Sequence, residues 1–153
     1  MRQWERRLFN AATGGVAVTG FAYLWMKYFI QNDDPFALVN HPWQGAMLAW
    51  HVVASPLLIL AFGIVLNSHV MKKLRVSGMP NRRTGFASLI MFALMVLSGY
   101  LLQVTTNESL IRALVVAHVG AGTIFSAAYT IHLVISWRLA RRARRADILT
   151  RVA

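Results

Sequence analysis

The chain has 153 residues, of which 57% are hydrophobic, and carries a formal net charge of +11 at pH 7. Soluble domains are nearer ~45–50% apolar, so this composition excludes an ordinary soluble domain and indicates an integral membrane protein. The chain contains no cysteine. This excludes a disulfide framework, thiolate-bound iron–sulfur clusters and the thioether attachment of c-type haem.

Four apolar segments are each long enough to cross about 30 Å of hydrocarbon as a helix. In chain order they cover about residues 8–30, 43–69, 85–104 and 110–137. The first is too long for a signal peptide, and no small-residue cleavage site follows it. We therefore predict an all-α fold, an up-down four-helix membrane bundle. It forms one domain over residues 1–153, ending in a basic tail at 138–153.

The basic residues predict the orientation of this bundle. All but two of the 16 Lys and Arg residues precede the first segment, lie between the second and third, or follow the fourth. The positive-inside rule therefore places both termini and the middle loop in the cytoplasm, as in a multi-pass protein of a bacterial inner membrane. These short juxtamembrane runs are expected to contact anionic lipid rather than nucleic acid.

Four of the five histidines lie in two of the apolar segments. His51 and His69 are 18 residues apart in the second segment, and His118 and His132 are 14 apart in the fourth. At about 100° and 1.5 Å per residue, each pair lies on nearly one helix face at two depths. The two segments run in the same direction, so His51 is level with His118, and His69 is within about one turn of His132. Ionisable side chains are costly in hydrocarbon, and this pattern predicts two stacked metal centres, most simply haem.

Glycines and one arginine accompany these histidines. Gly85 and Gly99 are also 14 residues apart, and Gly120 lies two residues after His118. Small residues let helices approach closely around a flat cofactor, although ordinary helix packing is the alternative for each. Arg112, six residues before His118, is a candidate partner for haem propionates or else an interfacial anchor. Further glycines in the first segment are Gly14, Gly15 and Gly20.

His41 lies at the outer end of the second segment, beside Pro42 and Trp43. Its simplest interpretation is an interfacial histidine in an aromatic belt. A second interpretation is a proton acceptor at an outward-facing quinol pocket, because histidine titrates near neutral pH. A third, a replacement metal ligand, ranks lowest because the residue is too shallow to match His118.

The combined pattern resembles the di-haem cytochrome b membrane subunits. The resemblance rests on the 14-residue intervals of His118 with His132 and of Gly85 with Gly99, and on the ending His-Leu-Val-Ile-Ser-Trp-Arg at 132–138. It covers about residues 8–140. The group includes the four-helix core of bc-type cytochromes and the small b-type anchors of hydrogenases and formate dehydrogenases. The interval of 18 residues between His51 and His69 departs from the family's usual interval of 13 or 14.

The resemblance implies two noncovalent haem b groups. His51 and His118 would ligate an outer haem, and His69 and His132 an inner one. The chain would then conduct electrons across the membrane as a subunit of a respiratory or photosynthetic complex, exchanging them with quinone and a partner redox subunit, rather than act as an enzyme alone. Two alternatives remain open: a haem-free structural or assembly subunit, and a pigment-binding subunit in which single histidines ligate chlorophylls.

Overall fold

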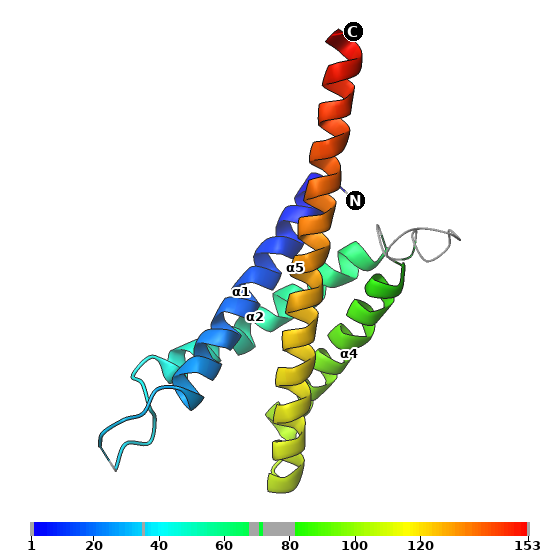
Figure 1. The fold of residues 1–153 in the computed structure, drawn as a ribbon. Coiled ribbons are helices and arrows are strands. Elements are labelled where there is room, and N and C mark those ends of the chain that lie inside the picture. The colour runs from blue at the N-terminus through cyan, green and yellow to red at the C-terminus, as the bar shows by residue number, and fades with distance from the viewer. Residues whose placement is uncertain (1, 35, 68–70, 72–81, 153) are drawn as a thin grey trace. The chain divides into compact units, whose positions relative to one another are not determined.

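The chain is described by a computed structural model over residues 2–34, 36–67, 71 and 82–152. It forms four long helices, α1 (Gln3–Tyr28), α2 (Gln44–Val65), α4 (Arg82–Val104) and α5 (Glu108–Val152) (Figure 1). The predicted all-helical fold is confirmed, and the four helices fall on the four predicted segments. The main difference is at the C-terminal end, where α5 does not stop at residue 137 but continues as helix through the predicted tail to Val152.

Local hydrogen bonds explain where the helices begin. The backbone N–H of Arg2 donates to the carboxylate of Glu5 (2.9 Å) at the start of α1. Asn107 precedes α5, and its Oδ1 accepts the backbone N–H of Leu110 at 3.0 Å. Both bonds satisfy backbone groups that have no partner within a helix. Pro56 lies inside α2 and does not end it.

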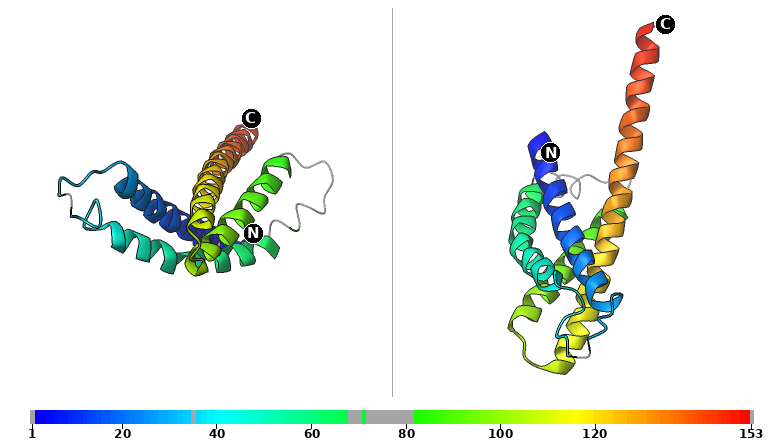
Figure 2. Two further views of the ribbon diagram at one scale, coloured as in Figure 1. Left: turned by 90° about the horizontal axis from the view of Figure 1, so that it is seen from below. Right: turned by 90° about the vertical axis from the view of Figure 1, so that its left-hand side faces the viewer.

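The chain divides into two compact units, Met1–Pro80 and Asn81–Ala153. In the first unit α1 packs against α2, and in the second α4 packs against α5 (Figure 2). Each unit is an antiparallel helical hairpin.

Aromatic contacts define the register of the first hairpin. The rings of Phe9 on α1 and Phe62 on α2 are 6.1 Å apart between centroids. Moving 11 residues along each helix from this pair, forward on α1 and backward on α2, leads to Gly20 and His51, which are also in contact. Val16, Leu58 and Ala61 are buried between these contacts.

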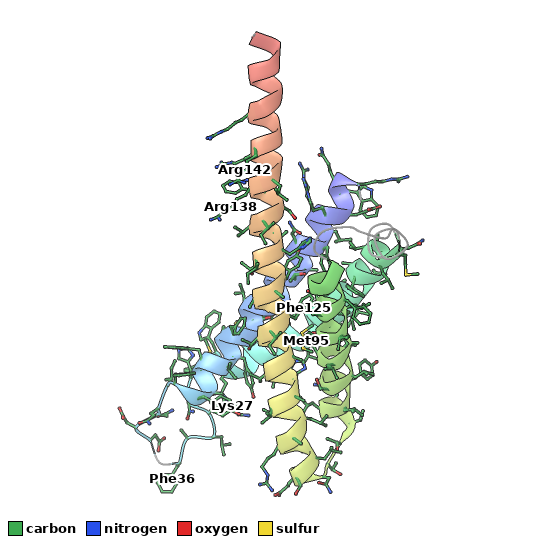
Figure 3. The ribbon with its side chains drawn as sticks, turned by 45° about the vertical axis from the view of Figure 1, so that its right-hand side comes forward. Lys27, Phe36, Met95, Phe125, Arg138 and Arg142 are labelled. Atoms are coloured by element: carbon green, nitrogen blue, oxygen red, sulfur yellow. The ribbon has the colours of Figure 1, made fainter. Side chains whose placement is uncertain are left out.

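The second hairpin has an equally regular register. The rings of Phe92 and Phe125 are 5.5 Å apart between centroids, and Met95 Sδ lies 3.5 Å from the Cβ position of Gly122. Figure 3 labels Met95 and Phe125 where α4 and α5 face each other. Gly99 follows Met95 by four residues on α4, and His118 precedes Gly122 by four residues on α5. The contact between Gly99 and His118 therefore continues the same register.

Three described helices are long and apolar enough to cross a membrane: α2 over Gln44–Val65, α4 over Phe86–Val104, and α5 over Glu108–Leu139. α1 forms a helix as predicted but is not among the three, so the prediction of four such spans is confirmed for three. The reason is its composition, because α1 interrupts its apolar residues with polar ones, including Asn10, Thr13 and Thr19.

The apolar side chains of these helices face outward to an unusual extent. Val116 is 74% exposed, Val53 is 65% exposed and Tyr100 is 70% exposed. Large apolar side chains are exposed along all three of these helices, and hydrocarbon is their favourable surrounding. The chain is therefore a multi-pass membrane protein.

Candidate functional site

His51 sits in the interface of the first hairpin. Its Nδ1 lies 2.9 Å from the carbonyl oxygen of Val16 on α1. A carbonyl oxygen can only accept a hydrogen bond, so Nδ1 must carry the proton and donate it. In the neutral ring this leaves a lone pair on Nε2. The described contact therefore selects one tautomer of His51.

Gly20 makes room for this imidazole. A Cβ atom at Gly20 would lie 2.8 Å from Cε1 and 2.9 Å from Nδ1 of His51. These separations are well below a normal van der Waals contact, so any other residue would push the ring away. Gly20 follows Val16 by four residues, which is one helical turn. The glycine and the accepting carbonyl consequently lie on the same side of α1.

His118 is held in the same way in the second hairpin. Its Nδ1 lies 2.9 Å from the carbonyl oxygen of Met95 on α4. A Cβ atom at Gly99, four residues after Met95, would lie 2.8 Å from Cε1 and 3.1 Å from Nδ1. We call these two arrangements the His51 seat (Val16, Gly20 and His51) and the His118 seat (Met95, Gly99 and His118). Each is complete within its own hairpin.

The two seats have the chemistry of axial haem ligands. A neutral histidine that donates its Nδ1–H to a carbonyl is held in one orientation, and its Nε2 becomes a better electron donor to a metal. Among the described residues, no group of three or more His, Asp or Glu side chains could hold a metal ion. That finding bears on sites built by protein ligands alone. A bis-histidine haem requires only two imidazoles, because the macrocycle supplies the other four ligands.

His132 lies on α5, 14 residues after His118, and is half-buried. Counting 14 residues from Gly99 and His118, back along α4 and forward along α5, leads to Gly85 and His132. The predicted interval shared by the histidines and the glycines thus matches the antiparallel register. His69, the predicted partner of His132, lies outside the described residues.

Among its described residues, the first hairpin has no histidine and glycine at the corresponding position. Counting 14 residues back along α1 from Gly20 leads to Arg6, and counting 14 residues forward along α2 from His51 leads to Val65. Val65 is buried in the helix interface, with 5% of its surface exposed. His69 follows Val65 by four residues. The two hairpins therefore match at the His51 and His118 seats and differ at the positions 14 residues beyond them.

Two other predicted site residues lie away from the seats. Gly120 is exposed on α5, and no atom lies within 4 Å of its Cβ position. Arg112 is exposed on the first turns of α5. Neither residue contributes to the His118 seat within this hairpin.

His41 differs chemically from His51 and His118. Its Nδ1 accepts the backbone N–H of Trp43 at 3.1 Å, just before α2 begins. When the ring is neutral, the proton is therefore on Nε2. This tautomer favours the prediction that His41 is an interfacial residue, because neither nitrogen then offers a lone pair to a metal.

Sequence patterns had pointed to the histidines and glycines of the seats but not to the accepting carbonyls. Val16 and Met95 participate through backbone oxygens, so their side chains carry no signal for this role. The signal that could have found them is the spacing, because each lies one turn before a glycine.

Comparison of the chain with protein-family models, with curated proteins and with solved structures finds no match. The functional assignment therefore depends on the geometry of the seats and on the sequence resemblance.

Replacing Gly99 by alanine tests the His118 seat. The new methyl group would overlap the imidazole, and overpacking of this kind costs about 1–3 kcal/mol, against about 1 kcal/mol gained by removing a helical glycine. We expect Gly99→Ala to lower the unfolding temperature of the detergent-solubilised chain, measured by circular dichroism. Gly120→Ala is the matched control and should leave it unchanged or raise it, because its Cβ position is open. Equal stability of the two variants would contradict the seat.

Proposed function

We propose that this chain is a b-type cytochrome of the membrane that carries electrons between the two sides of the bilayer. It would do so as one subunit of a respiratory or photosynthetic redox complex. When bound, haem supplies the one-electron chemistry, and the protein supplies ligands, orientation and a low dielectric. The chain itself would therefore hold each imidazole in one tautomer and one orientation within an apolar surrounding.

The repeated seat is the observation that supports this proposal. His51 and His118 each donate from Nδ1 to a helix carbonyl at 2.9 Å, and each ring lies against a glycine of the neighbouring helix. A histidine placed only to fill an interface would not need the same tautomer and the same close glycine twice. Histidine ligands to metals usually have such a carbonyl or carboxylate partner on the other nitrogen.

The proposal assigns His51 and His118 to one haem and His69 and His132 to a second. The first pair is supported by the matching seats in the two hairpins. For the second pair, support comes from His132 and Gly85, which lie at equal intervals from His118 and Gly99 along the two helices. Because Val65 occupies the corresponding position on α2, the inner site would be the less symmetrical of the two.

Arg112 and the quinone partner complete the proposal. Arg112 lies on the first turns of α5, six residues before His118, where its guanidinium would pair with propionates of the outer haem. Electrons would enter and leave through quinone and a partner redox subunit. His41, with its Nε2 proton, would act at the outer surface rather than as a ligand.

The positive-inside rule supports cytoplasmic termini in a bacterial inner membrane. Exposed arginines on the last turns of α5, including Arg138 and Arg142 (Figure 3), would then lie on the cytoplasmic side. The loop that displays Phe36, which is 89% exposed, would lie outside.

The haem assignment predicts selective losses on mutation. His51→Ala and His118→Ala should each remove one low-spin haem and leave the other, because loss of either axial ligand opens the site. The measurement is haem content per chain together with oxidised and reduced absorption spectra of the purified protein. His41→Ala is the matched control and should retain both haems.

Two results would count against this assignment. If His51→Ala and His118→Ala both keep two haems with unchanged spectra, the pairing is wrong. If the wild-type protein instead binds chlorophyll at five-coordinate sites, the pigment-binding alternative replaces the cytochrome.

The orientation can be tested with single cysteines, because the natural chain has none. We expect a membrane-impermeant maleimide to label Phe36→Cys in intact cells and to label Arg145→Cys only after the membrane is opened. Both positions are exposed, and neither change removes enough positive charge to alter insertion. Labelling of Arg145→Cys in intact cells would reverse the proposed orientation.

A further inference from the structure

A hydroxyl residue directly precedes the glycine in each seat. Thr19 precedes Gly20, and its Oγ1 donates to the carbonyls of Gly15 (2.8 Å) and Val16 (3.1 Å). Ser98 precedes Gly99, and its Oγ donates to the carbonyls of Leu94 (2.6 Å) and Met95 (3.2 Å). In both hairpins the hydroxyl reaches the same carbonyl that accepts the imidazole proton.

Several other hydroxyls on these helices bond to carbonyls that accept no imidazole proton, including Ser55, which donates to His51 O at 2.6 Å. Thr123 donates to Val119 O at 2.8 Å, and Thr130 donates to Ser126 O at 2.8 Å. Bonds of this kind to the preceding turn are common for Ser and Thr in apolar helices. The feature peculiar to Thr19 and Ser98 is therefore the shared carbonyl rather than the bond itself.

Ser98 also contacts the imidazole directly. Its Oγ lies 3.3 Å from Nδ1 of His118. The hydroxyl has one proton, and the shortest bond directs it to Leu94 O at 2.6 Å. The lone pairs of Oγ are then available to the His118 N–H, which is shared between Ser98 Oγ and Met95 O. Ser98 is buried, with 5% of its surface exposed, so water does not weaken these bonds.

We propose that Ser98 is a positioning residue for His118, holding its Nδ1–H tautomer and strengthening electron donation from Nε2. The argument rests on the proposed function for its redox consequence, but the tautomer can be tested without haem. A second acceptor on Nδ1–H draws the proton away from the ring and makes Nε2 more basic, which stabilises ferric iron. Removal of the hydroxyl should therefore favour the ferrous state of the haem that His118 ligates.

The first measurement is a redox titration of the purified, haem-loaded chain. Ser98→Ala should increase the ratio of ferrous to ferric haem at a fixed potential by about threefold for one haem, a positive shift of about 30 mV for a one-electron couple. Ser98→Thr should restore the natural potential, since Thr19 shows that threonine makes the same carbonyl bonds. Thr130→Ala, which removes a similar bond from α5 outside the seat, should cause no shift.

The second measurement uses nitrogen NMR of the imidazoles in the full chain without haem. Wild-type His118 should be protonated at Nδ1, and Ser98→Ala should increase the fraction protonated at Nε2. If Ser98→Ala does not fold, Ser98→Cys replaces it, because a thiol is a weaker acceptor of similar size and should shift both readouts in the same direction.

The two proposals fail in different ways. A wild-type chain that binds no haem overturns the proposed function, while the tautomer measurement still decides the role of Ser98. A chain that binds haem normally, with Ser98→Ala matching Thr130→Ala in potential and in tautomer, overturns the role of Ser98 and leaves the cytochrome proposal standing.

Discussion

The described site depends on one interaction, the hydrogen bond from a half-buried imidazole Nδ1–H to a backbone carbonyl of the neighbouring helix. A carbonyl in a helix already accepts one backbone N–H, and its second lone pair can be reached only if the helices approach closely. Glycine one turn after that carbonyl permits this approach at both Gly20 and Gly99. The bond fixes the tautomer, and the tautomer decides which nitrogen can bind a metal.

The same interaction gives the two hairpins a common plan. In each, one helix supplies a hydroxyl, a glycine and a carbonyl within a single turn, and the other supplies the histidine. Aromatic pairs farther along, Phe9 with Phe62 and Phe92 with Phe125, maintain the antiparallel register that aligns these groups. The hairpins differ beyond the shared seat, where Val65 of the first contrasts with His132 of the second. That contrast would make the two proposed haem sites unlike.

Much of this fold follows from the sequence because apolar length is a strong signal for membrane helices. The four helices lie where the apolar segments predict them, and the intervals of His118, His132, Gly85 and Gly99 match the register of α4 and α5. The end of α5 was missed because arginine and alanine favour helix as strongly as leucine does, so loss of hydrophobicity does not end the helix. The carbonyls of Val16 and Met95 could not be read from side chains, because every residue has one.

The central claim is that the seated histidines, His51 and His118, together ligate one b-type haem, and that His69 and His132 ligate a second. It is tested most directly by low-temperature electron paramagnetic resonance of the oxidised wild-type protein, combined with the number of haems extracted per chain. The account predicts two haems per chain, both low-spin with signals of bis-histidine coordination. A colourless protein, or one whose iron is high-spin and five-coordinate, would contradict it.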